Sequence, residues 1–497
     1  MKRVASAIVP LIQINRKGSQ ALHRQIYDSY RTAIVGGSLR PGQRIPSTRV
    51  LASELGVSRF PVLNAYAQLL AEGYFESRVG AGTVVSNSIP DHLTPSLPVR
   101  QRPPAPDPGL GPGPRPVARR CSILAHRERP SWLLSLGAFG VGQVAFDHFP
   151  VQLWASLGAR RCRNMTAQSA HYGDPTGSLA LRETIATYLR TARSVHCDAE
   201  QVMIVSGSQQ ALEISARVLL DPGSRVWVED PGYHLAKDVL ALAGCQLVPV
   251  PVDEEGLDVA TGTKRWRRAR AALVTPSHQY PLGVTMSASR RLQLLDWAQS
   301  SGAWILEDDY DSEYRYGSMP IASLQGLDAN SRVIYIGTFS KVLFPSLRLG
   351  YLVIPRDLVE RFREVRRVMD LGPPTFYQEV LADFIREGHF ARHIRRMRVL
   401  YGERARVLVD STHAELGTMV EVFGGEAGMH LAVMLKNGIR DMEMAERAAR
   451  QNLWLWPLSF FYLRDAVRSG FVLGFGSTDV AEIPRAVRKI RNLLAVK

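Results

Sequence analysis

Cysteine is scarce in this 497-residue chain, and long apolar runs are missing from it. The four cysteines, Cys121, Cys162, Cys197 and Cys245, lie far apart and show no metal-ligand spacing, which favours free thiols in a reducing cytoplasm over disulfides or a zinc site. The chain has no run of about 18 apolar residues, the length that could span a bilayer. Polar residues interrupt the apolar start of the chain early, so a signal peptide is not expected. The sequence therefore predicts a cytoplasmic protein with no membrane partner and no metal.

Acidic residues are few at the N-terminal end. Residues 1–90 contain eleven Lys/Arg and four Asp/Glu, a net charge of +7, and residues 91–130 add +4. Only +4 of the total of +15 remains for the last 367 residues. A polyanion partner is thus expected for the N-terminal end alone.

Prolines divide the chain. Nine of them lie between Thr94 and Pro116, in a segment that can form neither a helix nor a central strand. We expect an extended linker there. The predicted organisation is a basic head at 19–87, a Pro/Arg-rich linker at 88–130 and a body at 131–497.

The head shows helical periodicity followed by a glycine-rich hairpin. Ser47 and Ser58 are expected to cap a second and a third helix, with Pro61 tolerated in the first turn of the third. Two short strands are expected around Gly80 and Gly82. The positions expected to face the core of the head are Leu22, Ile26, Tyr30, Ile34, Val50, Leu51, Leu55, Val62, Tyr66 and Leu69.

Helix, turn, recognition helix and wing are typical of a DNA-binding winged helix-turn-helix, although a small bundle that binds nothing is the alternative. The order PGQRIPSTRVLASELGVSR resembles the GntR-type winged helix. The resemblance implies that Arg49, Ser58 and Arg59 contact promoter DNA, with the Gly80 wing reaching a neighbouring groove. Arg44 would add a phosphate contact. Because Phe60 and Pro61 cannot donate side-chain hydrogen bonds, base specificity is expected to fall on Asn64 and Arg59.

The body alternates strand-like and helical segments, which indicates an α/β fold with a mostly parallel sheet. Helical patterns cover 208–220 and 287–301. The strand-like runs are Gln201–Gly207, Ser224–Asp230, Arg270–Pro276, Ala303–Asp309, Arg332–Gly337 and Leu349–Pro355.

A lone lysine, Lys341, follows one of these core strands. A buried lysine must be paired or lose its charge, and a Schiff base to an aldehyde cofactor does the latter. Arg348 suits a phosphate, and the helix that begins at Ser208 offers a second anion site at its N-terminus. Carboxylates at 307–309 follow another strand, where one of them can hold a pyridine nitrogen protonated. Taken singly these signals are weak, since lysines and acids at strand ends are commonly solvated.

Their order resembles the fold-type I, class I/II aminotransferases. The segments AHYGDPTGSLALR, EDPGYH, TPSHQYPLG, EDDY and TFSK follow one another as in that family. The resemblance implies a pyridoxal 5'-phosphate cofactor, a body with large and small subdomains, and a homodimer. Lys341 would carry the cofactor as an aldimine, Asp308 would pair with the pyridine nitrogen, Tyr310 would meet the ring oxygen and Tyr233 would stack on the ring. The phosphate would be held by Gly207, Ser208, Gln209, Ser340 and Arg348, with Tyr172 reaching the cofactor of the other subunit.

Two departures from that family stand out. The asparagine of Asn-Pro-Thr-Gly is absent, with His278, Gln279 and Tyr280 nearby instead. The arginine that holds a substrate carboxylate in transaminases would lie at about Phe471 or Val472, and neither is charged. Loss of a bidentate clamp removes both binding and orientation, so transamination of amino acids is expected to be residual at most.

Winged helix, linker and aminotransferase-like body in this order resemble the MocR/GabR-type bacterial transcription regulators. That resemblance implies a regulator whose body senses pyridoxal phosphate itself or an amine or amino-acid effector. The alternative is an active aminotransferase with an autoregulatory DNA-binding head.

Overall fold

The computed structural model describes residues 12–78, 82–87, 118–121, 137–317, 321–436 and 439–495. Chain contacts divide it into two compact units, Met1–Pro116 and Val117–Lys497. The proline-rich segment lies outside the described residues, and of the predicted linker at 88–130 the structure describes 118–121, with a short 3-10 turn at Arg119–Cys121.

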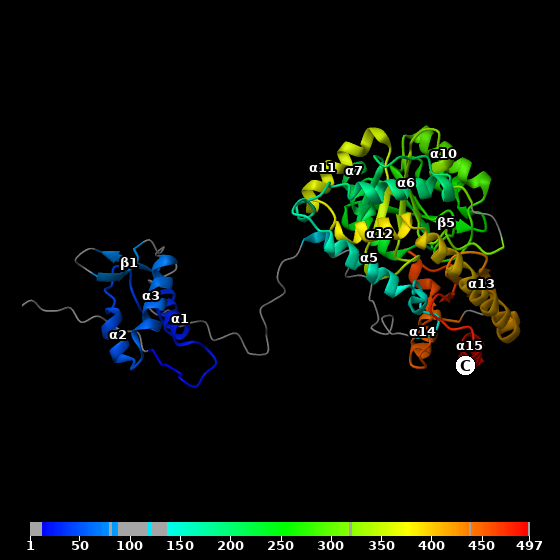
Figure 1. Cartoon of the computed structure of the whole chain (residues 1–497). Helices are drawn as coiled ribbons and strands as arrows, with labels where there is room; N and C mark the ends of the chain where they lie inside the picture. The colour runs from blue at the N-terminus through cyan, green and yellow to red at the C-terminus, as the bar shows by residue number, and fades with distance from the viewer. Residues whose placement is uncertain are drawn as a thin grey trace, which may run out of the picture. The chain divides into compact units, whose positions relative to one another are not determined.

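The first unit is a three-helix head with a hairpin (Figure 1). Its helices are α1 (Leu22–Val35), α2 (Thr48–Glu54) and α3 (Arg59–Ala71). Ser47 caps α2 by accepting a hydrogen bond from the backbone N–H of Val50 at 3.4 Å. Ser58 stands at the N-cap of α3, but its side chain makes no cap hydrogen bond, contrary to the expectation.

The core of the head contains the predicted apolar residues except Leu22, which is half-buried and outside the core, and Val50. Ile26, Tyr30, Leu51 and Leu69 are fully buried, whereas Val50 is 49% exposed. With only seven residues, α2 turns Leu51 and Ala52 inward and leaves Val50 on the outer side. The expectation that Val50 faces the core was wrong.

Strands β1 (Phe75–Arg78) and β2 (Gly82–Val85) form the antiparallel hairpin expected for the wing. A backbone bridge from Arg44 to Val84 joins the segment before α2 to the hairpin. Gly80, predicted at the wing tip, lies outside the described residues.

The second unit contains an eight-stranded sheet in the order β3-β10-β9-β8-β7-β4-β5-β6. From β9 to β5 neighbouring strands are parallel, while β10 is antiparallel to both β3 and β9. The six predicted strands are present, and β5 and β6 add the edge that the sequence reasoning missed. The strands are β3 (Val202–Val205), β4 (Arg225–Asp230), β5 (Gln246–Asp253), β6 (Gly256–Leu257), β7 (Ala271–Val274), β8 (Trp304–Asp309), β9 (Val333–Thr338) and β10 (Gly350–Val353).

Alternate residues of the strands point to opposite faces, as a pleated sheet requires. On β8, Leu306 packs against α7, α8 and α11 on one face, while Ile305 packs against α9 and α10 on the other. With both faces covered, the carboxyl ends of the parallel strands remain as the place for a site. The helices of this part are α5 (Val151–Arg163), α6 (Leu179–Arg193), α7 (Ser208–Leu219), α8 (His234–Leu242), α9 (Val259–Trp266), α10 (Ala288–Ser301) and α11 (Val359–Asp370).

A second sheet, in the order β11-β12-β14-β13, belongs to the C-terminal part of the body (Figure 1). Its strands are β11 (Val420–Gly424), β12 (His430–Leu435), β13 (Trp456–Pro457) and β14 (Gly470–Gly474), and the helices around it are α12 (Phe376–Arg386), α13 (His389–Leu416), α14 (Asp441–Ala449) and α15 (Ile483–Ala495). None of the helices in the described ranges is both long enough and apolar enough to cross a bilayer.

Candidate cofactor and DNA-binding sites

Lys341 lies three residues beyond the end of β9, at the carboxyl edge of the large sheet. Its Nζ donates to the carbonyl of Gly142 at 3.3 Å, and a Cβ built on Gly142 would come within 2.4 Å of that Nζ. Burial lowers the pKa of Lys341, although Asp311 and Asp308 oppose the shift. The amine is therefore closer to its neutral, nucleophilic form than an ordinary lysine.

The Arg348 guanidinium lies next to the N-terminus of α7. Gly207 precedes α7 with φ +90°, and a Cβ added there would lie 3.2–3.4 Å from the Arg348 guanidinium. Arg348 also donates to the carbonyl of Ser206 at 2.7 Å. The amide Nε2 of Gln209, in the first turn, is buried with no hydrogen-bond partner in the described structure. Free helix N–H groups, an arginine and an unused amide donor make an anion site.

Asp308 stands on β8 and lines a small hollow of about 10 Å³ together with Tyr233, Glu229 and Thr275. Its Oδ1 is buried and lacks a hydrogen-bond partner among the described atoms. Burial raises the pKa of Asp308 to about 7, with further increases from Asp309, Glu229 and Asp311. Such a carboxylate gains strongly from a cationic N–H partner.

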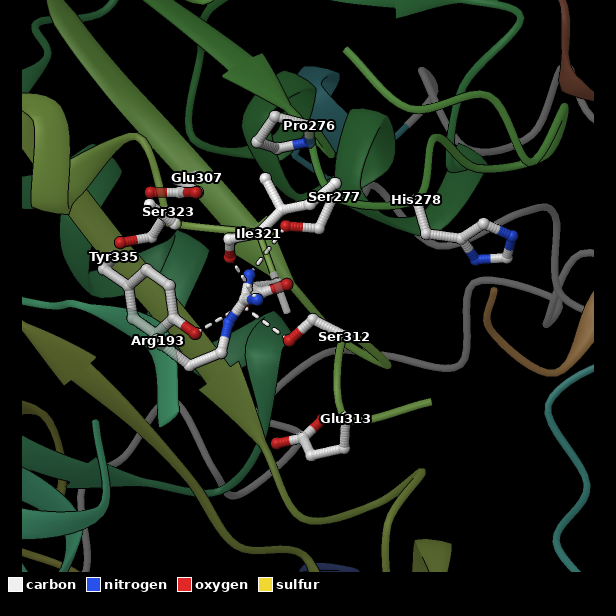
Figure 2. A network of polar contacts seen from close by, with 12 residues as sticks. Arg193, Pro276, Ser277, His278, Glu307, Ser312, Glu313, Ile321, Ser323 and Tyr335 are labelled. Carbon is white, nitrogen blue, oxygen red and sulfur yellow. Dashed lines mark hydrogen bonds and ion pairs between the residues drawn. The ribbon is translucent and has the colours of Figure 1, made fainter. Parts of the chain in front are cut away.

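Asp309, the next residue, is neutralised by a buried arginine of α6. Arg193 contacts Asp309 Oδ2 at 3.0 Å through Nε and 2.9 Å through its terminal nitrogen. It also donates to the carbonyl of Ile321 at 2.6 Å and to Ser277 Oγ at 2.8 Å (Figure 2). Tyr335 donates to the same Asp309 oxygen. Asp309 is thus paired with a cation through Oδ2, although its Oδ1, like Asp308 Oδ1, is buried without a hydrogen-bond partner among the described residues.

Ser277 and His278 are adjacent but point in different directions (Figure 2). Whereas Ser277 meets Arg193, His278 lies against Tyr310, whose hydroxyl donates to the His278 carbonyl at 3.0 Å and lies 3.1 Å from its Nδ1. Gln279 is bound to Glu229 and two backbone carbonyls.

The position of the missing asparagine follows from the spacing of its motif. Pro281 and Gly283 keep the separation of the proline and glycine of Asn-Pro-Thr-Gly, which places Tyr280 where the asparagine would be. The Tyr280 ring contacts Tyr233 at a centroid distance of 5.5 Å and Tyr310 at 6.0 Å. Tyr280 is therefore the residue beside both predicted ring contacts.

The other predicted cofactor residues are Ser340 and Tyr172, and the position expected for the carboxylate clamp lies in β14. Ser340 is buried, and its N–H donates to Thr338 Oγ1 at 3.2 Å. Tyr172 is 86% exposed, as a side chain that reaches a second subunit would be. Phe471 and Val472 are buried in β14, while Arg468 is exposed and lies 5.8 Å from the Phe423 ring centroid.

The predicted DNA contacts of the head are all exposed where the structure describes them. These are Arg44, Arg49, Ser58, Arg59 and Asn64. Arg59 donates to Thr48 Oγ1 at 3.1 Å, which joins the start of α3 to the start of α2. At the same place Phe60 is 69% exposed.

The described residues fit pyridoxal phosphate. An amine with a lowered pKa, an anion site at a helix N-terminus and an unpartnered buried carboxylate are the three partners that an aldehyde, a phosphate and a ring nitrogen need. All three lie at the carboxyl edge of one sheet.

Comparison with known proteins agrees with both parts of the chain. Residues 22–85 match the bacterial regulatory proteins of the gntR family, and residues 137–490 match the aminotransferase class I and II family. Over 482 residues the chain is 38% identical to the probable rhizopine catabolism regulatory protein MocR of Rhizobium meliloti, covering 97% of this chain and 95% of the relative. The chain belongs to the MocR family of transcription regulators.

Other relatives of this MocR-type regulator extend the comparison. The pyridoxine biosynthesis transcriptional regulator PdxR of Corynebacterium glutamicum is 31% identical, covering 96% of this chain and 98% of the relative. The crystal structure of Pyrococcus horikoshii kynurenine aminotransferase in complex with PMP superimposes with a TM-score of 0.70 and 28% identity, over 75% of this chain and 96% of that one. The MocR-type regulator is pyridoxal-phosphate-dependent, with a DNA-binding head and a ligand-binding, aminotransferase-like body.

Proposed function

We propose that pyridoxal phosphate is held in the cleft of the body at Lys341 and that the state of this cleft sets how the head binds promoter DNA. The observation that carries the proposal is a lysine with a lowered pKa at the same edge of the sheet as Asp308, whose Oδ1 is buried without a partner among the described residues and whose charge acts on that lysine. The remaining residues proposed to hold the cofactor are Tyr310, Tyr233, Gly207, Ser208, Gln209, Ser340 and Arg348.

The cofactor, when bound, supplies an electrophilic carbon and an electron sink. The protein residues orient it: Asp308 would hold the ring nitrogen protonated, and Arg348 with the α7 N-terminus would fix the phosphate. Tyr172 would reach the cleft of a second copy, which makes a homodimer the proposed assembly. Coupling to DNA requires that the ligand has different affinities for two arrangements of the protein.

The effector is proposed to be an amine. The residues for binding an amine through the cofactor are present, whereas the carboxylate clamp that efficient transamination of amino acids needs is absent from Phe471 and Val472. Residual turnover fits this arrangement, but steady turnover does not. The pyridoxine biosynthesis regulator among the relatives supports a second candidate, in which the cofactor itself is the effector.

The test is Lys341→Ala, with the exposed Lys264→Ala as its control. Protein loaded with pyridoxal phosphate should show a visible absorption band that Lys341→Ala abolishes while far-UV circular dichroism stays unchanged. Lys264→Ala should keep the band. A band that survives Lys341→Ala would refute the assignment of this lysine.

A further inference from the structure

Two buried histidines lie next to predicted cofactor residues: the charge of Lys341 lowers the pKa of His430, and the Tyr310 hydroxyl lies 3.1 Å from His278 Nδ1. His278 follows β7 and His430 begins β12, so they come from the large and the small part of the body. Both are only 2% exposed, and their ring centroids are 4.6 Å apart. Together with Asp311 they place potential ligand atoms within 4.8 Å of one another.

The bonding partners decide which nitrogen of each ring carries hydrogen. His278 Nδ1 lies 3.1 and 3.2 Å from the two Asp311 carboxylate oxygens, which only accept, so Nδ1 carries the proton. His430 bonds the carbonyl of Pro281, another pure acceptor, and the nitrogen without a partner is Nε2. In both rings Nε2 is therefore left as a lone-pair acceptor.

Both Nε2 atoms are buried and have no hydrogen-bond partner in the part of the chain that is described. Burial, with His278 and Lys341 nearby, holds the pKa of His430 well below its ordinary value, so the ring stays neutral. A buried acceptor without a partner is unfavourable, and a ligand with a donor group removes that cost on binding.

Two glycines with positive φ leave space for the His278 ring. Gly428 has φ +69°, and a Cβ there would lie 2.1 Å from His278 Cε1 and Nδ1. Gly283 has φ +75°, and its Cβ would lie 3.2 Å from His278 Nε2. Glycines on both sides thus leave the space that the imidazole occupies.

The surroundings disfavour a carboxylate as the group that meets these acceptors. A carboxylate has no hydrogen to donate, and Asp311 already places negative charge next to His278. The charged or titratable groups around the pair are Lys341, Asp308, Asp311, Tyr280 and Tyr310. Of these only Lys341 is a cation, and it is proposed to hold the cofactor.

We propose that His430, backed by the Asp311-bound His278, forms a subsite for a hydroxyl group of the effector, and that the effector class is hydroxyl-bearing primary amines rather than α-amino acids. This inference rests on the proposed function, because the amine is taken to bind beside Lys341. The hydroxyl donates to the His430 Nε2 acceptor, and the Tyr280 ring, 5.2 Å from His430, packs against the carbon skeleton.

Three amines with the same three-carbon chain and the amine on its middle carbon test the proposal on protein loaded with pyridoxal phosphate. 2-Amino-1,3-propanediol has two hydroxymethyl groups, serine has a carboxylate in place of one, and isopropylamine has neither. The concentration that gives half of the change in the cofactor absorbance should be lowest for the diol, by about tenfold against isopropylamine, the equivalent of one hydrogen bond. Serine that binds as well as the diol, or isopropylamine that equals it, would overturn the subsite.

Variants locate the effect. His430→Phe keeps a ring but removes the acceptor, so the diol should lose its advantage over isopropylamine. His430→Arg should shift the preference toward serine, and the exposed His413→Phe should change nothing. An unchanged preference in His430→Phe would overturn the proposal, and the wild-type comparison decides the case if the variant fails to fold.

Two further outcomes are distinguishable. Tight uptake of Zn²⁺ alone that His430→Phe abolishes would overturn the subsite in favour of a metal site. Absence of the cofactor band in wild-type protein would refute the proposed function and this inference with it, whereas a normal band with tighter binding of serine refutes the inference only.

Discussion

Arg193→Met is expected to destabilise the body strongly. The guanidinium makes two contacts to Asp309 Oδ2, one to the Ile321 carbonyl and one to Ser277, all in a buried site (Figure 2). Removing one partner of a buried ion pair leaves the other charge uncompensated, at a cost of about 3–5 kcal/mol. Asp309 keeps hydrogen bonds from Ser312 and Tyr335, which places the expected loss toward the lower end of that range.

The assay is thermal unfolding of the full chain, following the transition of the body. At ~2.1 cal/mol/K per residue, a unit of about 380 residues has an unfolding entropy of roughly 0.8 kcal/mol/K. A loss of about 3–4 kcal/mol should therefore lower the midpoint by about 4–5 °C. Arg361→Met is the control, because this exposed side chain forms a surface ion pair with Glu364, so its loss should stay under about 1 kcal/mol.

A double variant tests the reason for the loss. Arg193→Met combined with Asp309→Asn removes the uncompensated charge and should recover more than about 1 kcal/mol relative to Arg193→Met alone. The single change should also weaken retention of pyridoxal phosphate, because an unpaired Asp309 raises the pKa of Asp308 further. A loss below about 1 kcal/mol, or purely additive effects in the double variant, would refute the electrostatic role of Arg193.

Three further predictions concern the cofactor site and the head. In cofactor-free protein the raised pKa of Asp308 stabilises the fold fully below about pH 4, and this stability is lost as the pH rises toward 7. Asp308→Asn should therefore flatten the decline of the unfolding midpoint between about pH 4.5 and 8. Parallel midpoint curves for the variant and the wild type would contradict the prediction. Arg59→Ala should weaken binding of a specific duplex by about 1–3 kcal/mol in a titration at fixed salt. Unchanged affinity would mean that Arg59 only bonds to Thr48 and does not contact DNA. Gly428→Ala should displace His278 and lower the midpoint of body unfolding, because Ala has both a strained φ and a Cβ too close to the ring; a wild-type midpoint would show that the loop adapts.

The sequence was informative about the large sheet because short apolar runs bounded by turn residues identify buried strands. Lys341 follows β9 and Asp308 lies on β8, as expected, because each motif directly adjoins an apolar run that the sequence identifies as a strand. The antiparallel direction of β10 was not predictable, because pairing direction depends on how the chain returns and not on the composition of the strand.

The missed parts of the site are long-range contacts. Arg193 meets Asp309 across 116 positions of the chain, and it looks like an ordinary C-terminal arginine of a helix until the fold brings them together. His430 begins a strand whose apolar pattern gives no hint of a neighbour at His278. The replacement of the motif asparagine by Tyr280 could have been read from the proline and glycine spacing, which is the one signal that was available and unused.

The most direct test of cofactor-dependent regulation is binding of a labelled duplex from upstream of this protein's own gene. Cofactor-stripped protein and protein loaded with pyridoxal phosphate are compared at fixed salt, with a scrambled duplex as control, because phosphate contacts make affinity depend on salt. The account predicts specific binding whose affinity changes with loading or with an added amine. Equal affinity for the two duplexes in every state, together with steady turnover of an amino acid and a keto acid, would contradict it and favour an enzyme.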